Sequence, residues 1–486
     1  WLFLLAVFLI IVPLAGQDFF VRYYDNGGNE RARFCTVAHD RIVLVGNTTV
    51  DAVDRLAGVA QFLDLDGKVL QSVRIDTNRR TFLFGAAPLN PVDPAAGWLI
   101  GGDQNNYETV DDVAFYRLGP DAEARGTFGW GRPEEDEQLR NLLALADGTF
   151  VAMGNIGTSN LAYARRMDGA GNVLWYRTWS VPEGSFNVFQ DAVELPDGLL
   201  LAGYSTPDSR FAELVLAKFR PDGELLWSYL YDYPNQTDEG IRSITVTPTG
   251  EIYAVVRVIG PDRFVDALVI HLTADGEVLG ETLLSGAGDL VMNDSHLTAD
   301  GNLLLAGAVS VTANGLQAVV VELSPAGRIV RQRTLGNARV SSLLDIEPAP
   351  AGGYFLAGYG TPCDGDADML LAYLDENLEN PRESCSQAEA VPLEVQVAAE
   401  VDRRSGGTVA NREDPSVAIA VTSPTNVGVQ VENCPTLNLD ADASSAPTTP
   451  GGFRTTVDCY AEPLPVVDAD ALLDFAQPVP RGILLS

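Results

Sequence analysis

A short apolar run that ends in glycine returns along the chain about every fifty residues. One copy is LLLAG at Leu199–Gly203, and the same pattern occurs in six other places. The closing residue is Gly46, Gly102, Gly154, Gly203, Gly307 or Gly358, with Val255 in the remaining copy. Successive copies are 56, 52, 49, 52, 52 and 51 residues apart. Seven copies at one period predict a repeat architecture in which each unit buries apolar surface against its neighbours.

Each copy has the same internal order of turns and apolar runs. A turn such as Asp197-Gly198 opens the unit, because glycine adopts a positive φ without a steric penalty. After the glycine-ended run and a polar loop comes a second run, such as LVLAKF from Leu214. A second turn, such as Asp222-Gly223, precedes LLWSYLY from Leu225, and a run such as IRSITVT from Ile241 leads into the next unit. This order predicts four short strands in each unit.

Four strands repeated seven times predict an all-β fold, a seven-bladed β-propeller with four-stranded blades over residues 17–385. FVRYYD at Phe20–Asp25 is similar to WSYLYD at Trp227–Asp232, which is the outer strand of a unit. The last unit loses the pattern soon after YLD at Tyr373. We therefore expect the N-terminal strand to complete the last blade and close the ring.

The two ends of the chain differ from the repeat. Residues 386–486 are rich in Ala, Val, Thr, Ser and Pro, and they contain strand-like segments and a Ser/Thr/Pro-rich stretch from Ser444. This C-terminal β-rich segment is expected to be either a β-sandwich-like domain or a linker region. Residues 1–16 are apolar and then small, typical of a secretory signal peptide, with a buried strand or helix as the alternative. No later run reaches 18 apolar residues, so no membrane span is expected after signal removal.

The cysteines agree with a secreted or cell-surface location. Cys363 with Cys385, and Cys434 with Cys459, lie close enough in sequence to form disulfide bonds. Cys35 would be left over as a buried apolar residue. None of the five has the CxxC spacing of a zinc knuckle.

Charge excludes some partners. The chain has 66 acidic and 32 basic residues, a formal net charge of −34. Such a charge disfavours binding to the phosphates of nucleic acid and to anionic lipid. Because many acids fall in predicted loops and Asp-Gly turns, the charge describes a solvated surface better than a catalytic pocket.

One acidic loop is a candidate for calcium. Asp364, Asp366 and Asp368 are spaced by two residues, as at the start of a calcium-binding loop. The twelfth position from Asp364 is Asp375 and not the glutamate of such loops, so a solvated acidic loop is the alternative. No other cofactor is predicted.

Other candidates for chemistry lie near predicted loops. An acid precedes the second apolar run in four units, at Asp112, Glu213, Asp266 and Asp368. These acids would either form a ring of carboxylates at one mouth of the propeller or hydrogen-bond nearby backbone. Three aromatic residues near loops would either stack on sugars or pack between blades; they are Tyr107, Trp130 and Tyr204. No nucleophile elbow, Walker loop, HExxH or dinucleotide motif is present, which favours a non-enzymatic role.

The units resemble the propeller repeats of secreted Bacteroidetes proteins. The resemblance rests on the glycine-ended strand, the acid before a strand like LVLAKF, and DGELLW from Asp222, and it covers residues 17–385. It implies a surface protein of the kind exported with a C-terminal sorting domain, although that domain is not visible in this chain. The GxxxW segments at Gly171–Trp175 and Gly223–Trp227 are also similar to quinoprotein-type propellers, but only two units carry them.

These observations favour a secreted or cell-surface propeller that acts as a structural or binding module in adhesion, a surface layer or an extracellular assembly. Protein partners or self-assembly through the C-terminal β region are expected, with glycans as further candidate ligands. The alternative is a polysaccharide-acting enzyme or lectin with its site at the central channel. Two carboxylates about 5–10 Å apart beside exposed aromatic residues would favour the enzyme.

Overall fold

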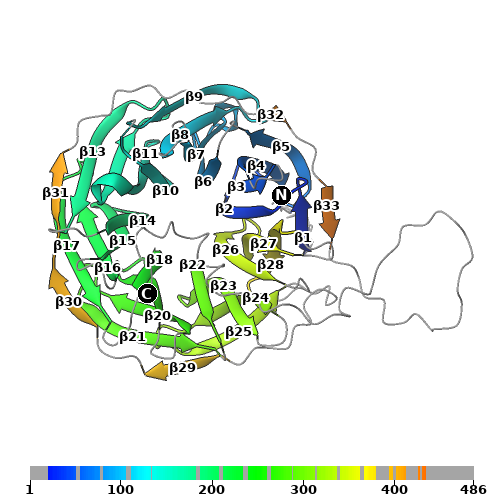
Figure 1. Ribbon diagram of the computed structural model, residues 1–486. Helices are drawn as coiled ribbons and strands as arrows, with labels where there is room; N and C mark the ends of the chain where they lie inside the picture. The colour runs from blue at the N-terminus through cyan, green and yellow to red at the C-terminus, as the bar shows by residue number, and fades with distance from the viewer. Residues whose placement is uncertain are drawn as a thin grey trace, which may run out of the picture.

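The computed structural model shows seven antiparallel sheets arranged in a ring (Figure 1). It describes residues 20–433 except 51–54, 77–79, 106–110, 133, 182–185, 207–211, 234–238, 260–263, 287, 312–314, 336–339, 362–365, 379–392, 398–400, 412–424 and 427–429. The expected signal peptide and the four cysteines expected in disulfides (Cys363, Cys385, Cys434 and Cys459) lie outside the described residues. Cys35 is buried and free, as predicted.

Each blade is a four-stranded sheet whose strands follow one another outward from the centre of the ring. Blade 1 contains β2 (Glu30–Ala38), β3 (Arg41–Thr49), β4 (Leu56–Asp64) and β5 (Val69–Ile75). Blade 2 contains β6 (Thr81–Pro88), β7 (Trp98–Asn105), β8 (Asp111–Leu118) and β9 (Ala124–Trp130). Blade 3 contains β10 (Glu137–Ala144), β11 (Phe150–Ile156), β12 (Leu161–Met167) and β13 (Val173–Ser180).

The next three blades repeat this order. Blade 4 contains β14 (Phe186–Leu195), β15 (Gly198–Thr206), β16 (Glu213–Phe219) and β17 (Leu225–Asp232). Blade 5 contains β18 (Glu239–Val246), β19 (Ile252–Ile259), β20 (Val265–Leu272) and β21 (Val278–Ser285). Blade 6 contains β22 (Leu290–Leu297), β23 (Leu303–Val311), β24 (Gly315–Leu323) and β25 (Ile329–Leu335). Over the described residues, no helix is long and apolar enough to cross a lipid bilayer.

Blade 7 is completed by the N-terminal strand. It contains β26 (Ser341–Pro348), β27 (Tyr354–Gly360), β28 (Asp368–Leu374) and, at its outer side, β1 (Phe20–Asp25). β1 pairs antiparallel with β28, with Phe20 opposite Tyr373 and Tyr24 opposite Met369. The predicted seven-bladed propeller and its closure by the N-terminal strand are therefore confirmed.

The glycine that defines the repeat is explained by a bulge in the innermost strand of each blade. In blade 1 the register shifts between Ala32 and Phe34, so Arg33 is an extra residue. A Cβ on the opposing Gly46 would lie 1.8 Å from the carbonyl oxygen of Arg31, a distance that no side chain tolerates. Blade 5 tolerates a valine, and its structural equivalent of the glycine is Val256, one residue after the Val255 that the spacing suggested.

The turns between third and fourth strands pack against the preceding blade. Gly223 has φ +81°, and a Cβ there would lie 2.8 Å from the indole ring of Trp175 in blade 3. Trp175 also donates its Nε1–H to the carbonyl of Pro221 at 3.0 Å. The tryptophan of the GxxxW segment at Gly171–Trp175 therefore serves contact between blades.

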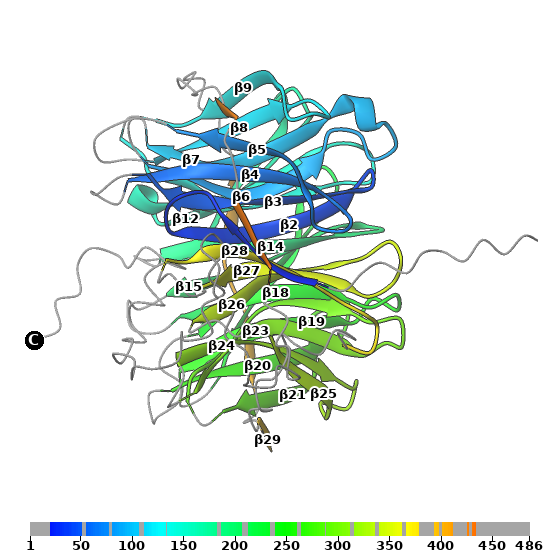
Figure 2. The same cartoon turned by 90° about the vertical axis from the view of Figure 1, so that its right-hand side faces the viewer.

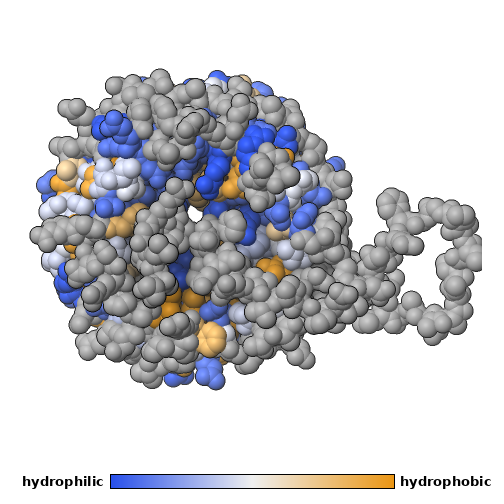
Figure 3. Space-filling model, viewed as in Figure 1, coloured by the Kyte–Doolittle hydropathy of each residue, from blue (hydrophilic) through white to orange (hydrophobic). Residues whose placement is uncertain are grey.

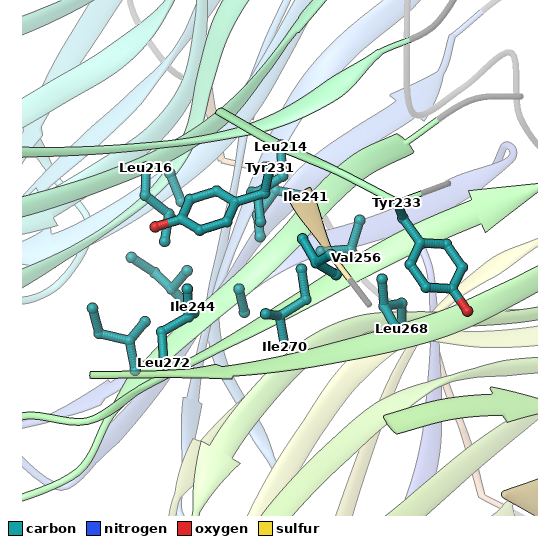
Figure 4. Packing of buried hydrophobic residues seen from close by; sticks show 14 of the residues in the cluster. Leu214, Leu216, Tyr231, Tyr233, Ile241, Ile244, Val256, Leu268, Ile270 and Leu272 are labelled. Carbon is teal, nitrogen blue, oxygen red and sulfur yellow. The ribbon is translucent and has the colours of Figure 1, made fainter. Parts of the chain in front are cut away.

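Apolar side chains fill the space between neighbouring blades. Between blades 4 and 5, Leu216 and Tyr231 pack with Ile244, Leu268 and Ile270, all at most 4% exposed (Figure 4). Each fully buried side chain of this size contributes roughly 1.5–3 kcal/mol relative to an exposed one. No blade buries such a face alone, which is why the ring must be closed.

The described part of the C-terminal region adds strands to the outer edges of the blades. These short strands are β29 (Glu394–Val397), β30 (Asp402–Ser405), β31 (Thr408–Asn411), β32 (Thr425–Asn426) and β33 (Gln430–Asn433). They pair antiparallel with β21, β17, β13, β5 and β1 in turn, so they follow the ring in the reverse of the blade order (Figure 1). Figure 2, turned by 90°, again places β29 at the outer rim.

This arrangement differs from the β-sandwich-like domain or linker expected for residues 386–486. The five described strands pair with the blades and not with one another. The physical reason is that an outer blade edge presents unpaired N–H and C=O groups, and the backbone of a short added strand satisfies them whatever its side chains are. We call these five strands the C-terminal strap.

Specific contacts hold the strap in place. Arg404 donates to both carboxylate oxygens of Glu213 at 2.6 Å. The guanidinium of Arg403 lies 4.3 Å from the centre of the Tyr229 ring. Gly407 has φ +80°, and a Cβ there would lie 2.1 Å from the Trp179 ring. Glycine at this position therefore lets the strap backbone lie directly against blade 3.

Candidate functional site

The two ends of the propeller are built differently. At one end, most of the turns share one hydrogen-bonding pattern, in which a glycine N–H such as that of Gly223 donates to the carbonyl three residues earlier at 2.9 Å. The two-residue His39-Asp40 turn and the longer connection 89–97 are built differently. At the other end, the connections inside a blade vary from three residues (312–314) to seven residues (361–367). We call this second end the loop mouth. Binding residues concentrate in variable loops on a rigid scaffold, so the loop mouth is the candidate functional end.

The innermost strands surround an opening at the centre of the ring, and Figure 3 shows hydrophilic residues beside it. Each of these strands carries one extra residue at its bulge. The seven residues are Arg33, Phe84, Arg140, Gln190, Arg242, Asn293 and Leu344. Three arginines at one repeated position stand out in a chain with twice as many acids as bases.

Aromatic rings lie against several arginines near the loop mouth. The Arg33 guanidinium lies 5.5 Å from the Phe82 ring centre and 5.3 Å from that of Phe84. Arg80 lies 5.1 Å from the Phe82 ring, and Arg31 lies 4.4 Å from the ring of Tyr359. We call Arg31, Arg33, Arg80, Phe82 and Phe84 the arginine–aromatic group. Such stacking holds a guanidinium plane in one orientation while leaving its N–H edges available.

Neutral amides orient two of the bulge arginines. Arg33 donates through Nε to Asn47 Oδ1 at 3.0 Å, and Arg140 donates through Nε to Asn155 Oδ1 at 3.2 Å. Burial, together with the positive charges of Arg31 and Arg140, lowers the pKa of Arg33 to about 9. Burial is the main cause of this shift, and the charge of Asp103 opposes it.

Carboxylates near the channel brace one blade against the next. Asp191 accepts the backbone N–H of Ile244 in the next blade at 2.8 Å, and Asp294 accepts that of Ile346 at 2.9 Å. Asp345 accepts the N–H of Cys35 across the junction between blades 7 and 1. Each of these aspartates directly follows the bulge residue of its innermost strand. One repeated position therefore supplies a contact to the next blade in blades 4, 6 and 7.

Burial raises the pKa of all three bracing carboxylates. Burial raises the pKa of Asp191 to about 7, and the charge of Asp294 adds to this effect. Asp294 and Asp345 share a hydrogen bond, and burial raises the pKa of both. Burial and the charge of Asp294 raise the pKa of Glu347 to about 8. A hydrogen-bonded pair is closer than the roughly 5–9.5 Å that separates the two carboxyl groups of most glycoside hydrolases.

A second acidic cluster lies where the ring closes. Asp25, Glu30 and Asp368 each place a carboxylate oxygen within 4.8 Å of the other two. They come from β1, β2 and β28, so both partners of the ring closure and the first strand of blade 1 contribute. We call these three residues the closure triad. Glu30 and Asp368 are fully buried and Asp25 is half-buried.

Glu30 is held at the centre of the closure triad. Thr48 donates its hydroxyl to Glu30 Oε1, whereas Oε2 is buried and has no hydrogen-bond partner among the described residues. Burial raises the pKa of Glu30 to about 8, and the charges of Asp368 and Asp25 add to this effect. A carboxylate in such surroundings needs a proton or a cation.

The structure groups the predicted calcium-loop residues differently. Asp368 joins Asp25 and Glu30, neither of which the sequence analysis identified. Asp366 is exposed, and Asp364 lies outside the described residues. Asp25 and Glu30 are separated from Asp368 by more than 300 residues, so no local spacing connects them.

The other sequence candidates serve the fold. Asp112 is buried, and its charge is among those that raise the pKa of Glu137 in the next blade to about 8, burial being the main cause. Glu213 holds Arg404 of the strap. Trp130 and Tyr204, proposed as sugar-stacking or packing residues, are 1% and 6% exposed and pack within the propeller. Tyr107 lies outside the described residues.

The bulge arginines were not identified from the sequence. Arg33, Arg140 and Arg242 precede the glycine, or Val256 in blade 5, by 13 or 14 residues. The sequence signal that could have identified them is an arginine 13 or 14 residues before the repeated glycine.

No family model and no curated protein matches the chain. Among solved structures, it is similar to a protein of unknown function from Dyadobacter fermentans, with TM-score 0.37, 10% identity, and coverage of 73% of this chain and 97% of that one. It is also similar to a puromycin-hydrolyzing peptidase from Mycobacterium tuberculosis, with TM-score 0.41, 12% identity, and coverage of 71% of this chain and 51% of the peptidase. At these scores, neither similarity indicates what this chain binds or does.

Proposed function

We propose that the protein is a secreted or cell-surface binding module whose loop mouth recognises an acidic glycan, in adhesion or in an extracellular assembly. The arginine–aromatic group is the observation that carries this proposal. Planar guanidinium groups match carboxylate and sulfate geometry, and aromatic rings nearby offer faces for sugar rings. Both features lie on the innermost strands near the variable loops.

The charge of the chain gives this site its selectivity. A net charge of −34 repels acidic polymers from most of the surface. Arg31 and Arg140 are close enough for their charges to act on Arg33, and Arg80 lies against the same Phe82 ring as Arg33. An acidic glycan would therefore bind in one place, and salt would weaken the binding.

Rigidity also supports a binding role. The braces from Asp191, Asp294 and Asp345 join blades 4 to 5, 6 to 7 and 7 to 1, and Asp103 accepts the N–H of Leu139 to join blades 2 and 3. The described strap strands add to the outer edges of five blades, including blades 1 and 3. A site assembled from blades 1, 2 and 3 keeps its geometry only if those blades do not shift. A preorganised site loses less entropy on binding.

The test is a glycan array with the full chain, including uronic-acid, sulfated and neutral glycans. We expect binding to the acidic glycans, at least tenfold weaker in R33Q and R140Q. R166Q is the matched control. Arg166 pairs with Asp147 at the end of the propeller opposite the loop mouth, so this substitution should leave glycan binding unchanged. Binding only to neutral glycans, or to acidic peptides and no glycan, would contradict the proposal.

A polysaccharide-acting enzyme is the second candidate, and the Asp294–Asp345 pair is the observation that favours it. Two carboxyl groups near the channel that share a hydrogen bond and have raised pKa values resemble an acid–base pair. Each also accepts a backbone N–H from the next blade, which makes bracing the better account. Polysaccharide hydrolysis by the full chain that D294N and D345N both abolish, while both still fold, would favour the enzyme.

A further inference from the structure

We propose that the closure triad binds a calcium ion that fastens the ring where its two ends meet. This inference is independent of the glycan site, because the triad lies at the junction of blades 7 and 1 and uses different residues. It also differs from the calcium loop expected at Asp364–Asp368, since only Asp368 belongs to both.

The geometry of the triad suits a cation. Calcium binds oxygen ligands at about 2.3–2.6 Å, so two ligands on opposite sides of the ion are about 5 Å apart. The carboxylate oxygens of Asp25, Glu30 and Asp368 all lie within 4.8 Å of one another. One ion placed among them would therefore contact all three without a change in the backbone.

A second, independent observation points to a ligand. Glu30 is fully buried, yet its Oε2 has no hydrogen-bond partner among the described residues. Gln61 of blade 1 is also fully buried; its Nε2 donates to Asn26 Oδ1 at 3.2 Å, while its Oε1 has no partner among the described residues. Leaving such oxygens unsatisfied costs free energy, and a bound cation would satisfy them.

The donor atoms select the kind of cation. The triad supplies only oxygen ligands, whereas zinc prefers histidine nitrogen and cysteine sulfur. Calcium accepts six to eight oxygens in irregular geometry, whereas magnesium requires a near-ideal octahedron at about 2.0–2.1 Å. Water on the half-buried side of Asp25 would complete the coordination of calcium.

The expected consequence is a stronger ring closure. β1 is paired with β28 over only five residue pairs. Without a cation, burial and the charges of Asp368 and Asp25 raise the pKa of Glu30 to about 8, so its carboxyl group holds a proton at neutral pH. A calcium ion would replace that proton and link β1, β2 and β28.

The test uses the full chain, treated with a chelator and then transferred to calcium-free buffer at neutral pH. Isothermal titration with calcium chloride should show one site per chain. In E30Q, which keeps the shape of the side chain, the affinity should fall at least tenfold. D25N should lower the affinity by the same factor. Because Asp25 is only half-buried, this variant keeps the test decisive if E30Q fails to fold.

E137Q is the matched control. Glu137 occupies the same position in blade 3, three residues before the bulge, and it is also buried beside an aspartate of the preceding blade. Among the described residues it does not belong to a cluster of three ligands, so E137Q should bind calcium as the wild type does.

Hydrogen exchange gives the second readout. Calcium should slow amide exchange in β1 and β28 of the wild type and of E137Q, and should leave E30Q unchanged. No binding to the wild type at millimolar calcium, or equal affinity in E30Q and D25N, would overturn the proposal. An effect on glycan binding alone, with no change in calcium affinity, would also overturn it.

Discussion

Contact between blades through the turn glycines can be measured with one pair of alanine substitutions. Gly223 and Gly148 both have φ +81°, so alanine at either position pays the same backbone cost, about 1–2 kcal/mol. A Cβ at position 148 meets nothing within 4 Å, whereas one at position 223 would lie 2.8 Å from the Trp175 ring. The ring must move, and overpacking of this kind costs about 1–3 kcal/mol.

We therefore expect G148A to lower the free energy of unfolding by about 1–2 kcal/mol and G223A by about 2–5 kcal/mol. Urea unfolding of the full chain, followed by circular dichroism, measures both, and the slope against urea should be unchanged. The fluorescence of Trp175 should also change in G223A alone. Equal destabilisation by the two variants, with unchanged fluorescence, would refute the claim that this turn packs on blade 3.

Three further predictions test the pH response, the strap and the ring closure. Burial raises the pKa of Glu347 to about 8, so the folded chain keeps a proton that the unfolded chain releases. Stability should therefore fall as pH rises from about 5 to about 8, and E347Q should remove part of that slope in urea unfolding at stepped pH. R404M breaks the half-exposed pair with Glu213 and should cost about 0.5–1 kcal/mol, yet it should speed amide exchange in β30. Y24F removes the 2.7 Å hydrogen bond to the carbonyl of Gly67 in the neighbouring blade and should cost about 1–3 kcal/mol by thermal unfolding. An unchanged pH slope in E347Q, unchanged exchange in R404M, or an unaltered melting temperature in Y24F would count against the respective contact.

The propeller could be predicted because its determinants are local and repeated. The glycine at positions such as Gly46 lies opposite a bulge where a Cβ would meet the backbone, and the turn glycines such as Gly223 are favoured by positive φ and contact with the preceding blade. Glycines therefore recur at corresponding positions in most blades, and this repeat is visible in the sequence. The similarity of Phe20–Asp25 to an outer strand was enough to predict ring closure, because outer strands share one pattern.

The C-terminal strap could not be predicted in the same way. Its strands have only two to four residues, and their partners are the outer edges of blades far away in sequence. Nothing in a segment such as Thr408–Asn411 distinguishes a strand of a sandwich from one added to β13. The closure triad has the same difficulty, because Asp368 meets Glu30 only after the ring has closed.

The strap and the closure triad both stabilise the position of β1, the strand that closes the ring. A ring closed by an N-terminal strand can open if that strand leaves, and β1 has only six residues. β33 pairs with the other edge of β1, with Arg22 opposite Asn433 and Tyr24 opposite Val431. β1 is therefore held by β28 on one side, by β33 on the other, and by the carboxylates of the triad at its end. Loss of β1 would open blade 7 beside blade 1, which carries Arg31 and Arg33, so a stable closure is also a condition for the proposed binding site.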